Sequence, residues 1–180
     1  MYKLGQVREI PLSRTKLILA SFGSLIFVGL GFLFVIKPER FVSPFMRTPA
    51  LIFIGGLASI IFFGLCLFFI TKKLGDNSPG LVISEEGIFD NSSGVSAGQI
   101  KWTDIEDISV IEIHRQKLIM LHVTNPQDYI DKQTSGFKRK IMQVNYKMYG
   151  TPLSITSNGL KISFSELLSL LTDILKEARD

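Results

Sequence analysis

Residues 17–36 read LILASFGSLIFVGLGFLFVI and contain no charged side chain. Fourteen of these twenty residues are Leu, Ile, Val or Phe, and the other six are Gly, Ser or Ala. Residues 50–70 repeat the pattern, with fourteen strongly apolar residues, six Gly, Ala or Ser residues and one cysteine. Twenty helical residues rise about 30 Å, which matches the hydrocarbon thickness of a bilayer. The sequence therefore predicts two transmembrane helices, over about 17–36 and 50–70.

A pair of buried core helices or a cleavable signal peptide would fit these runs less well. Buried core helices would need a large globular domain around them, and only about 100 residues remain after the second run. A cleavable signal peptide has an apolar region of about 7–15 residues and a small-x-small cleavage site. The first run is longer, and it ends in FLFVIKPER without such a site. We therefore expect a permanent hairpin over residues 1–73.

The connection over residues 37–49, KPERFVSPFMRTP, contains three prolines, which prevent one continuous helix. Thr48 and Pro49 predict an N-cap and a first helical turn. We expect Phe41 and Phe45 at the membrane interface. Small residues four apart, which let transmembrane helices approach closely, occur as Ala20/Ser24 and Gly55/Ser59.

Basic residues near the two runs predict the orientation of the hairpin. Six flank its outer ends and three lie in the connection: Lys3, Arg8, Arg14, Lys16, Lys72 and Lys73 against Lys37, Arg40 and Arg47. Because Lys and Arg accumulate on the cytoplasmic side, both termini are predicted to be cytoplasmic, with the hairpin in the inner membrane. Cys66 is the only cysteine and lies in the second run, so the polar part has none for a disulfide.

The sequence pI of 9.2 does not indicate nucleic-acid binding, because the basic excess is local. After Lys73 the chain has eleven Lys and Arg residues against fourteen Asp and Glu residues. The excess therefore belongs to the membrane flanks, where it faces anionic lipid. Nucleic acid is not an expected partner.

Residues 74–80, which include GDNSPG, are a turn-rich linker to a soluble domain over 81–180. The ten residues 71–80 span at most about 35 Å, so the domain stays close to the bilayer. Residues 81–84 and 88–90 flank EEG and predict a hairpin. Residues 98–110, GQIKWTDIEDISV, alternate as a half-buried strand does, and Trp102, the only tryptophan, is expected to anchor the wall of the core.

Further hairpins are predicted for residues 108–114 with 117–123, and for residues 153–156 with 160–163 around Ser157-Asn158-Gly159. A C-terminal helix should begin with a capping box of Ser163 and Glu166. Its apolar residues recur at helical spacing: Phe164, Leu167, Leu168, Leu171, Ile174, Leu175 and Ala178. The predicted fold class is an α+β membrane protein whose small antiparallel β-barrel or bent sheet is closed by that helix.

The order LVISEEGIFD, GQIKWTDIEDISV and SNGLKISFSELLSLL resembles a bacterial pleckstrin-homology-like (PH-like) domain. Together with the hairpin and NYKMYGTP (145–152), nearly the whole chain is similar to a family of uncharacterised bacterial membrane proteins with two N-terminal helices. The resemblance implies a fold and no known reaction. Phosphoinositide-binding relatives in the wider superfamily use basic residues between the first strands. Here that region reads SEEGIFDNSSGVSAGQ, with acids and no Lys or Arg, so we do not expect that role.

Residues 125–149 form a predicted helical insertion. Asn125-Pro126 opens a short helix, and Ser135-Gly136 ends it. In a second helix, Phe137, Ile141, Val144 and Met148 fall on one face; Lys140 and Lys147 border it, and Lys138 and Arg139 lie farther round. Two interpretations remain open. The helix packs this face on the sheet and its lysines are solvated, or the four basic residues contact anionic lipid or a partner.

The sequence contains no arrangement that suggests an enzyme, a metal site or a cofactor site. His114 and His122 lack Cys or acidic ligands at metal spacing. The acids Asp104, Glu106 and Asp107 alternate between faces, which indicates a solvated edge rather than a carboxylate pair.

We expect a non-enzymatic binding module that presents a cytoplasmic PH-like domain to a protein or peptide near the inner leaflet. The alternative is a small assembly subunit or immunity-type protein that recognises its partner through the helices. Homo-oligomerisation through the helices is left open.

Overall fold

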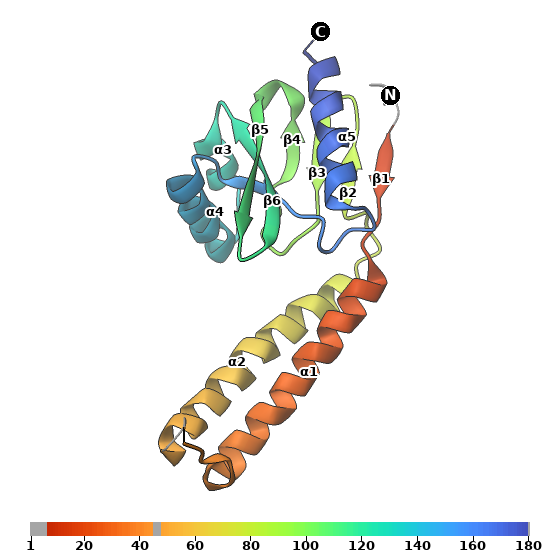
Figure 1. The fold of residues 1–180 in the computed structure, drawn as a ribbon. Coiled ribbons are helices and arrows are strands. Elements are labelled where there is room, and N and C mark those ends of the chain that lie inside the picture. Colours follow the sequence, from red (N-terminus) through yellow and green to blue (C-terminus); the bar gives the residue numbers. More distant parts are fainter. Residues whose placement is uncertain (1–6, 45–47, 180) are drawn as a thin grey trace. The chain divides into compact units, whose positions relative to one another are not determined.

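The computed structural model describes residues 7–44 and 48–179 (Figure 1). The chain divides into two compact units. The first, here called the sheet domain, comprises the chain before Arg14 and from Ser78 onward. The second, the helical hairpin, is Arg14–Asn77. The sequence predictions for Lys3, Phe45 and Arg47 lie outside the described residues.

The helical hairpin consists of α1 (Arg14–Ile36), a 3₁₀ turn (Pro38–Phe41) and α2 (Pro49–Leu74). Both helices are long and apolar enough to cross a membrane, which confirms the prediction at the level of length and composition. Only 11% of the apolar window of each helix is buried, whereas a core helix of a soluble protein would be mostly covered. α2 begins at Pro49 as predicted, although the Thr48 side chain makes no capping hydrogen bond.

The two helices are in close contact at Gly31 and Gly56. A Cβ atom on Gly31 would lie 2.9 Å from the Gly56 carbonyl oxygen, and one on Gly56 would lie 2.8 Å from the Gly31 oxygen. Ser59 Oγ donates across the pair to the Phe27 carbonyl oxygen at 3.0 Å. The prediction of a close contact at Gly55 is wrong, because a Cβ atom there would meet no atom within 4 Å.

The first sheet of the sheet domain has four antiparallel strands in the order β1 (Arg8–Ile10), β2 (Leu81–Ile83), β3 (Gly87–Asp90) and β4 (Gly98–Lys101). The predicted β2–β3 hairpin is confirmed. The sequence does not predict β1, which pairs with β2 through Arg8↔Ile83 and Ile10↔Leu81. The whole helical hairpin is therefore inserted between two paired strands of one sheet.

The second sheet has three antiparallel strands in the order β5 (Ile105–Ile113), β6 (Gln116–Val123) and β7 (Leu153–Ile155). The β5–β6 hairpin is confirmed, and its turn lies at His114-Arg115, where both residues have positive φ.

The prediction of one continuous strand over residues 98–110 is wrong. β4 ends at Lys101, Trp102–Asp104 forms a 3₁₀ turn, and β5 continues in the other sheet. The turn brings Trp102 into the core, where Nε1 donates to the Ser84 carbonyl oxygen at 2.9 Å. The alternation of apolar and polar residues therefore does mark Ile100 and Trp102 as residues that face the core. The parts of the stretch before and after the 3₁₀ turn nevertheless belong to different sheets.

The prediction of a hairpin around Asn158-Gly159 is also wrong. β7 pairs with β6, and the residues after Gly159 turn to the N-terminal segment instead. Leu160 bridges Leu12, and Lys161 N donates to the Pro11 carbonyl oxygen at 2.9 Å. Neither Asn158 nor Gly159 adopts the positive φ that a two-residue hairpin turn requires.

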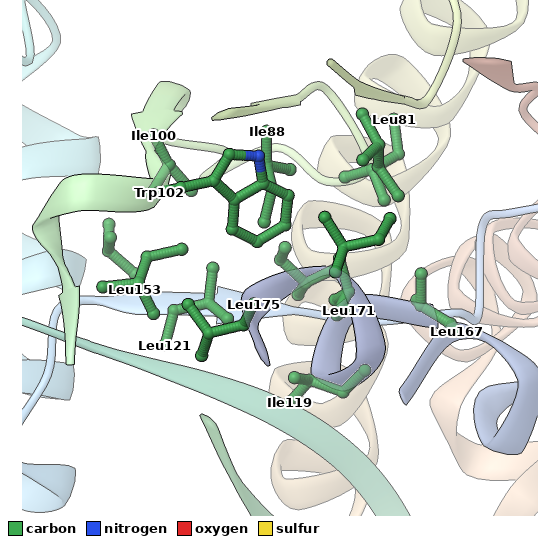
Figure 2. Packing of buried hydrophobic residues seen from close by; sticks show 14 of the residues in the cluster. Leu81, Ile88, Ile100, Trp102, Ile119, Leu121, Leu153, Leu167, Leu171 and Leu175 are labelled. Atoms are coloured by element: carbon green, nitrogen blue, oxygen red, sulfur yellow. The ribbon is translucent and has the colours of Figure 1, made fainter. Parts of the chain in front are cut away.

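Helix α5 (Phe164–Glu177) supplies one wall of the core (Figure 2). The predicted cap is present, because Ser163 Oγ accepts from the Glu166 amide at 3.2 Å. Leu167, Leu171 and Leu175 are buried as expected, and Leu170, which lies outside the predicted set, is buried with them. These side chains pack with residues of both sheets. The α+β class with antiparallel sheets is thus confirmed, but the two sheets form separate ladders, and within the described residues no barrel is closed.

Candidate contact surface on α4

The insertion between β6 and β7 contains α3 (Pro126–Asp131) and α4 (Gly136–Tyr149), which contact one another (Figure 1). The predicted break between the two helices is present at Ser135, whose side chain caps α4 by accepting from the Lys138 amide. α4 ends at Gly150, whose φ of 75° lies in the left-handed region that glycine adopts without strain. These end signals fix where α4 begins and ends.

α4 is attached to the domain by the face that contains Met142, which is fully buried. Asn145 and Tyr149, one and two turns farther along the same face, are half-buried. Arg139 Nη2 donates to the Gln133 carbonyl oxygen at 2.9 Å, which ties the first turn to the end of the α3 segment.

The apolar residues at helical spacing point away from this attachment. Phe137 is 64% exposed, Val144 46% and Met148 64%, and Ile141 is half-buried at the border. We call these four residues the α4 strip. α4 does pack on the sheet domain, as the first interpretation holds, but the packing contact is made by Met142, outside the strip, and the strip itself is exposed. The strip runs about 16 Å along the helix.

The four predicted basic contact residues are not equivalent. Lys140 and Lys147 are exposed, and at 100° per residue they lie along one edge of the strip. Lys138 is half-buried on the other side, and Arg139 is engaged with Gln133. In the described part of the chain, neither Lys140 nor Lys147 has a carboxylate within 4.0 Å. Lys140 and Lys147 are therefore the two basic side chains placed to act together with the strip.

Charge is strongly segregated within the sheet domain. Four of the thirteen Lys and Arg residues of this domain lie in α4, and none of its fourteen Asp and Glu residues does. The rest of the domain therefore carries nine basic and fourteen acidic residues. An exposed apolar strip with a basic edge can enter the headgroup region of an anionic bilayer, or it can receive an apolar and acidic protein surface.

Tyr129 and Asp104 are engaged in a structural hydrogen bond. Tyr129 donates to Asp104 Oδ2 at 2.7 Å, and its burial, with this hydrogen bond, raises the pKa of Tyr129 to about 12. The interpretation of a solvated acidic edge is wrong for Asp104, which is half-buried and holds α3. The same interpretation agrees with the structure for Glu106 and Asp107, which are exposed.

The histidines lie apart from one another in the hairpin of β5 and β6. His122 Nε2 is 2.8 Å from Ser109 Oγ on the neighbouring strand, and His114 occupies the exposed turn. Across residues 7–44 and 48–179, no group of three or more His, Cys, Asp or Glu residues is placed to hold a metal ion.

Asp90 is the most deeply buried carboxyl group among the described residues, at the end of β3. Its Oδ1 accepts from the Ser92 amide at 2.9 Å, which closes the turn into the 91–97 loop. Burial raises the pKa of Asp90 above the ordinary value of an aspartate, against the lowering effect of hydrogen bonds from Ser92 and Ser96. The ionised form is therefore less favoured in the folded than in the unfolded chain.

The Asp90→Asn variant should consequently change the pH dependence of stability. A raised folded-state pKa contributes stability that is fully present below the unfolded pKa and is lost as pH rises through the folded pKa. Asp90 therefore contributes a loss of stability that begins at about pH 4, and we expect the free energy of unfolding of the wild type, taken relative to that of Asp90→Asn, to be lower at pH 7 than at pH 4. Urea titrations of the full chain in detergent at both pH values measure this. The control is Asp107→Asn at an exposed site; equal pH dependence of wild type and Asp90→Asn would contradict the prediction.

Comparison with known proteins adds no further assignment. No protein-family model, no curated protein and no solved structure matches the chain.

Proposed function

We propose that the protein is a membrane-anchored, non-enzymatic binding module. Its two apolar helices span the cytoplasmic membrane, both termini are cytoplasmic, and the sheet domain is presented to a protein or peptide partner near the inner leaflet. The observation that carries the proposal is the pairing of β1 with β2 across the inserted helical hairpin. A domain whose sheet contains strands from both sides of the hairpin is held to the membrane by two connections.

Both connections are short, which supports a positioning role. Only residues 11–13 separate β1 from α1, and residues 75–80 separate α2 from β2. At about 3.5 Å per residue these segments span at most about 10 Å and 20 Å. A domain tethered in this way has a high effective concentration for any partner at the same membrane surface.

The pairing of β1 with β2 also supports the proposed orientation. Paired strands lie on one side of a bilayer, so the segments that precede α1 and follow α2 must share a compartment. The greater number of basic residues on these flanks than in the connection favours the cytoplasm.

Two antiparallel sheets with a C-terminal helix packed into their shared core support the resemblance to a PH-like domain. The resemblance brings no reaction with it. The hydrogen bonds of Asp104, Tyr129 and Asp90 to neighbouring groups support a structural role for them, and the proposal therefore places the function in surface contacts.

An exchange of the membrane segment tests the proposal. Residues 14–77 are replaced with an unrelated two-helix hairpin, and the flanks that contain β1 and β2 are kept. We expect the proteins crosslinked to the wild type in native membranes to be crosslinked to this chimera as well, as identified by mass spectrometry. The control is the reciprocal chimera, in which residues 14–77 join an unrelated domain. This chimera should no longer be crosslinked to those proteins.

Partners that follow residues 14–77 would instead favour the alternative, an assembly subunit or immunity-type protein that recognises its partner through the helices. One observation gives this alternative weight. Four glycines of the hairpin do not serve its internal packing, since a Cβ atom on each would meet nothing within 4 Å: Gly23, Gly29, Gly55 and Gly64. Such positions let another helix approach closely, whether from a partner or from a second copy.

A further inference from the structure

We propose that α4 is a membrane-contact helix: its apolar strip enters the headgroup region of the anionic bilayer that anchors the protein, and Lys140 and Lys147 bind lipid phosphates along its edge. The inference rests on the anchoring in the proposed function but not on any protein partner. It adds that the sheet domain lies on the lipid through a second site.

The α4 strip is uncovered in the folded domain. Phe137 and Met148 are each 64% exposed and Val144 is 46% exposed, although α4 is well anchored through fully buried Met142. The outward direction of these side chains is therefore a fixed property of the fold. Removing large apolar side chains from water is favourable, so these three residues form a strong contact once water is excluded.

The charges of the domain match an anionic lipid surface at α4 alone. α4 carries four basic and no acidic residues, whereas the remainder of the sheet domain carries nine basic and fourteen acidic residues. An anionic bilayer repels the acidic surface and attracts this one helix, so the electrostatic field selects which face of the domain turns to the lipid. Lysine side chains suit this position because their apolar stems follow the helix while the ammonium groups reach the phosphates.

The short connections to the hairpin favour lipid over a protein as the occupant of the strip. They keep the domain within a few residues' reach of the bilayer, so lipid is present at an effective concentration that no diffusing partner matches. A basic edge beside an apolar strip on a helix is also the usual composition of interfacial helices.

The test uses the full chain in vesicles, with a Cys66→Ala background that removes the only cysteine. An environment-sensitive fluorophore is attached at Val144→Cys in the strip. The matched control is Gln143→Cys, which is exposed on the same helix and points about 100° away from Val144. We expect nitroxide-labelled lipid to quench the Val144 probe much more strongly than the Gln143 probe in vesicles that contain phosphatidylglycerol. In pure phosphatidylcholine the difference should be reduced.

A charge variant tests the role of the lysines. Each Lys near an anionic surface contributes about 1 kcal/mol, so Lys140→Gln with Lys147→Gln should lower the ratio of lipid-bound to free α4 by about 30-fold. The control pair is Lys101→Gln with Lys176→Gln, which removes the same charge from exposed sites outside α4 and should leave the quenching unchanged. Unchanged Trp102 emission verifies that each variant is folded.

Three results would overturn the inference: equal quenching at Val144 and Gln143, quenching that is independent of phosphatidylglycerol, or an equal effect of the two lysine pairs. If the probe at Val144→Cys is shielded from the nitroxide-labelled lipid only after native membrane proteins are added, the strip binds a protein partner instead. Because the vesicles contain no other protein, failure here leaves the hairpin exchange to decide the proposed function separately.

Discussion

Trp102→Ala should destabilise the sheet domain by about 3–5 kcal/mol, the usual cost of removing a large aromatic side chain from a core. Trp102 is 5% exposed and lies beside Ile88 and Ile100, with α5 residues such as Leu171 beneath it (Figure 2). The substitution also removes the donor to the Ser84 carbonyl oxygen, which joins the 3₁₀ turn to the end of β2. A small domain is stable by only about 5–15 kcal/mol, so the loss would be a large part of the total.

Pulse proteolysis of the full chain in detergent, across a urea series, measures this effect without needing tryptophan emission. The matched control is Phe137→Ala, an aromatic truncation on the exposed α4 strip, which should change the free energy of unfolding by less than about 0.5 kcal/mol. Similar midpoints for the two variants would show that Trp102 does not anchor the core.

The elements that could be predicted from the sequence are those with a long, local signal. α1 and α2 follow from uncharged apolar runs that are too long for the core of a domain this small. α5 follows from an apolar face repeated over four turns and a capping box at Ser163. The β2–β3 and β5–β6 hairpins follow from two strand-like runs joined by a short turn.

The pairings that the sequence did not predict depend on contacts between distant residues. β1 has three residues, too few for a periodic pattern, and its partner β2 lies some seventy residues later. In the predicted hairpin, residues 153–156 would pair with the strand that contains Leu160. In the structure the same N-terminal segment pairs with Leu160 instead, through Leu12. Asn-Gly is a strong local turn signal, but here the long-range pairing with Leu12 is the arrangement that the fold adopts.

The direction of α4 could not be predicted because the face that packs on the domain is less apolar than the face that is exposed. Phe137, Ile141, Val144 and Met148 form the longer stripe, and a helix with one apolar stripe normally buries it. The attachment instead uses Met142 with half-buried Asn145 and Tyr149. One fully buried methionine on a mixed face is a weak signal, so the sequence alone left open whether the longer stripe is packed or exposed.

Ile10→Asp should destabilise the sheet domain by at least about 3 kcal/mol, since it places a carboxylate without a partner in the core. Ile10 is 3% exposed and lies opposite Leu81, so the charge would also disturb the β1–β2 ladder. Trp102 is the only tryptophan, and its emission during urea titration of the full chain reports the domain. Glu9→Ala, at the exposed neighbouring position, is the control and should remain within about 0.5 kcal/mol of wild type. If Ile10→Asp lowers the free energy of unfolding only slightly, β1 does not complete the sheet.

Disulfide formation tests the same strand independently of stability. Glu9 lies opposite Val82, and Val82 lies opposite Phe89 on the next strand. Opposed residues have Cα atoms about 4.5–5.5 Å apart, within disulfide range, whereas residues two strands apart are about 10 Å away. In the Cys66→Ala background, Glu9→Cys with Val82→Cys should therefore oxidise to a disulfide, detected as a linked peptide, and Glu9→Cys with Phe89→Cys should not. A reversed result would break the β1–β2 register, and with it the conclusion that the helical hairpin is inserted within the sheet domain.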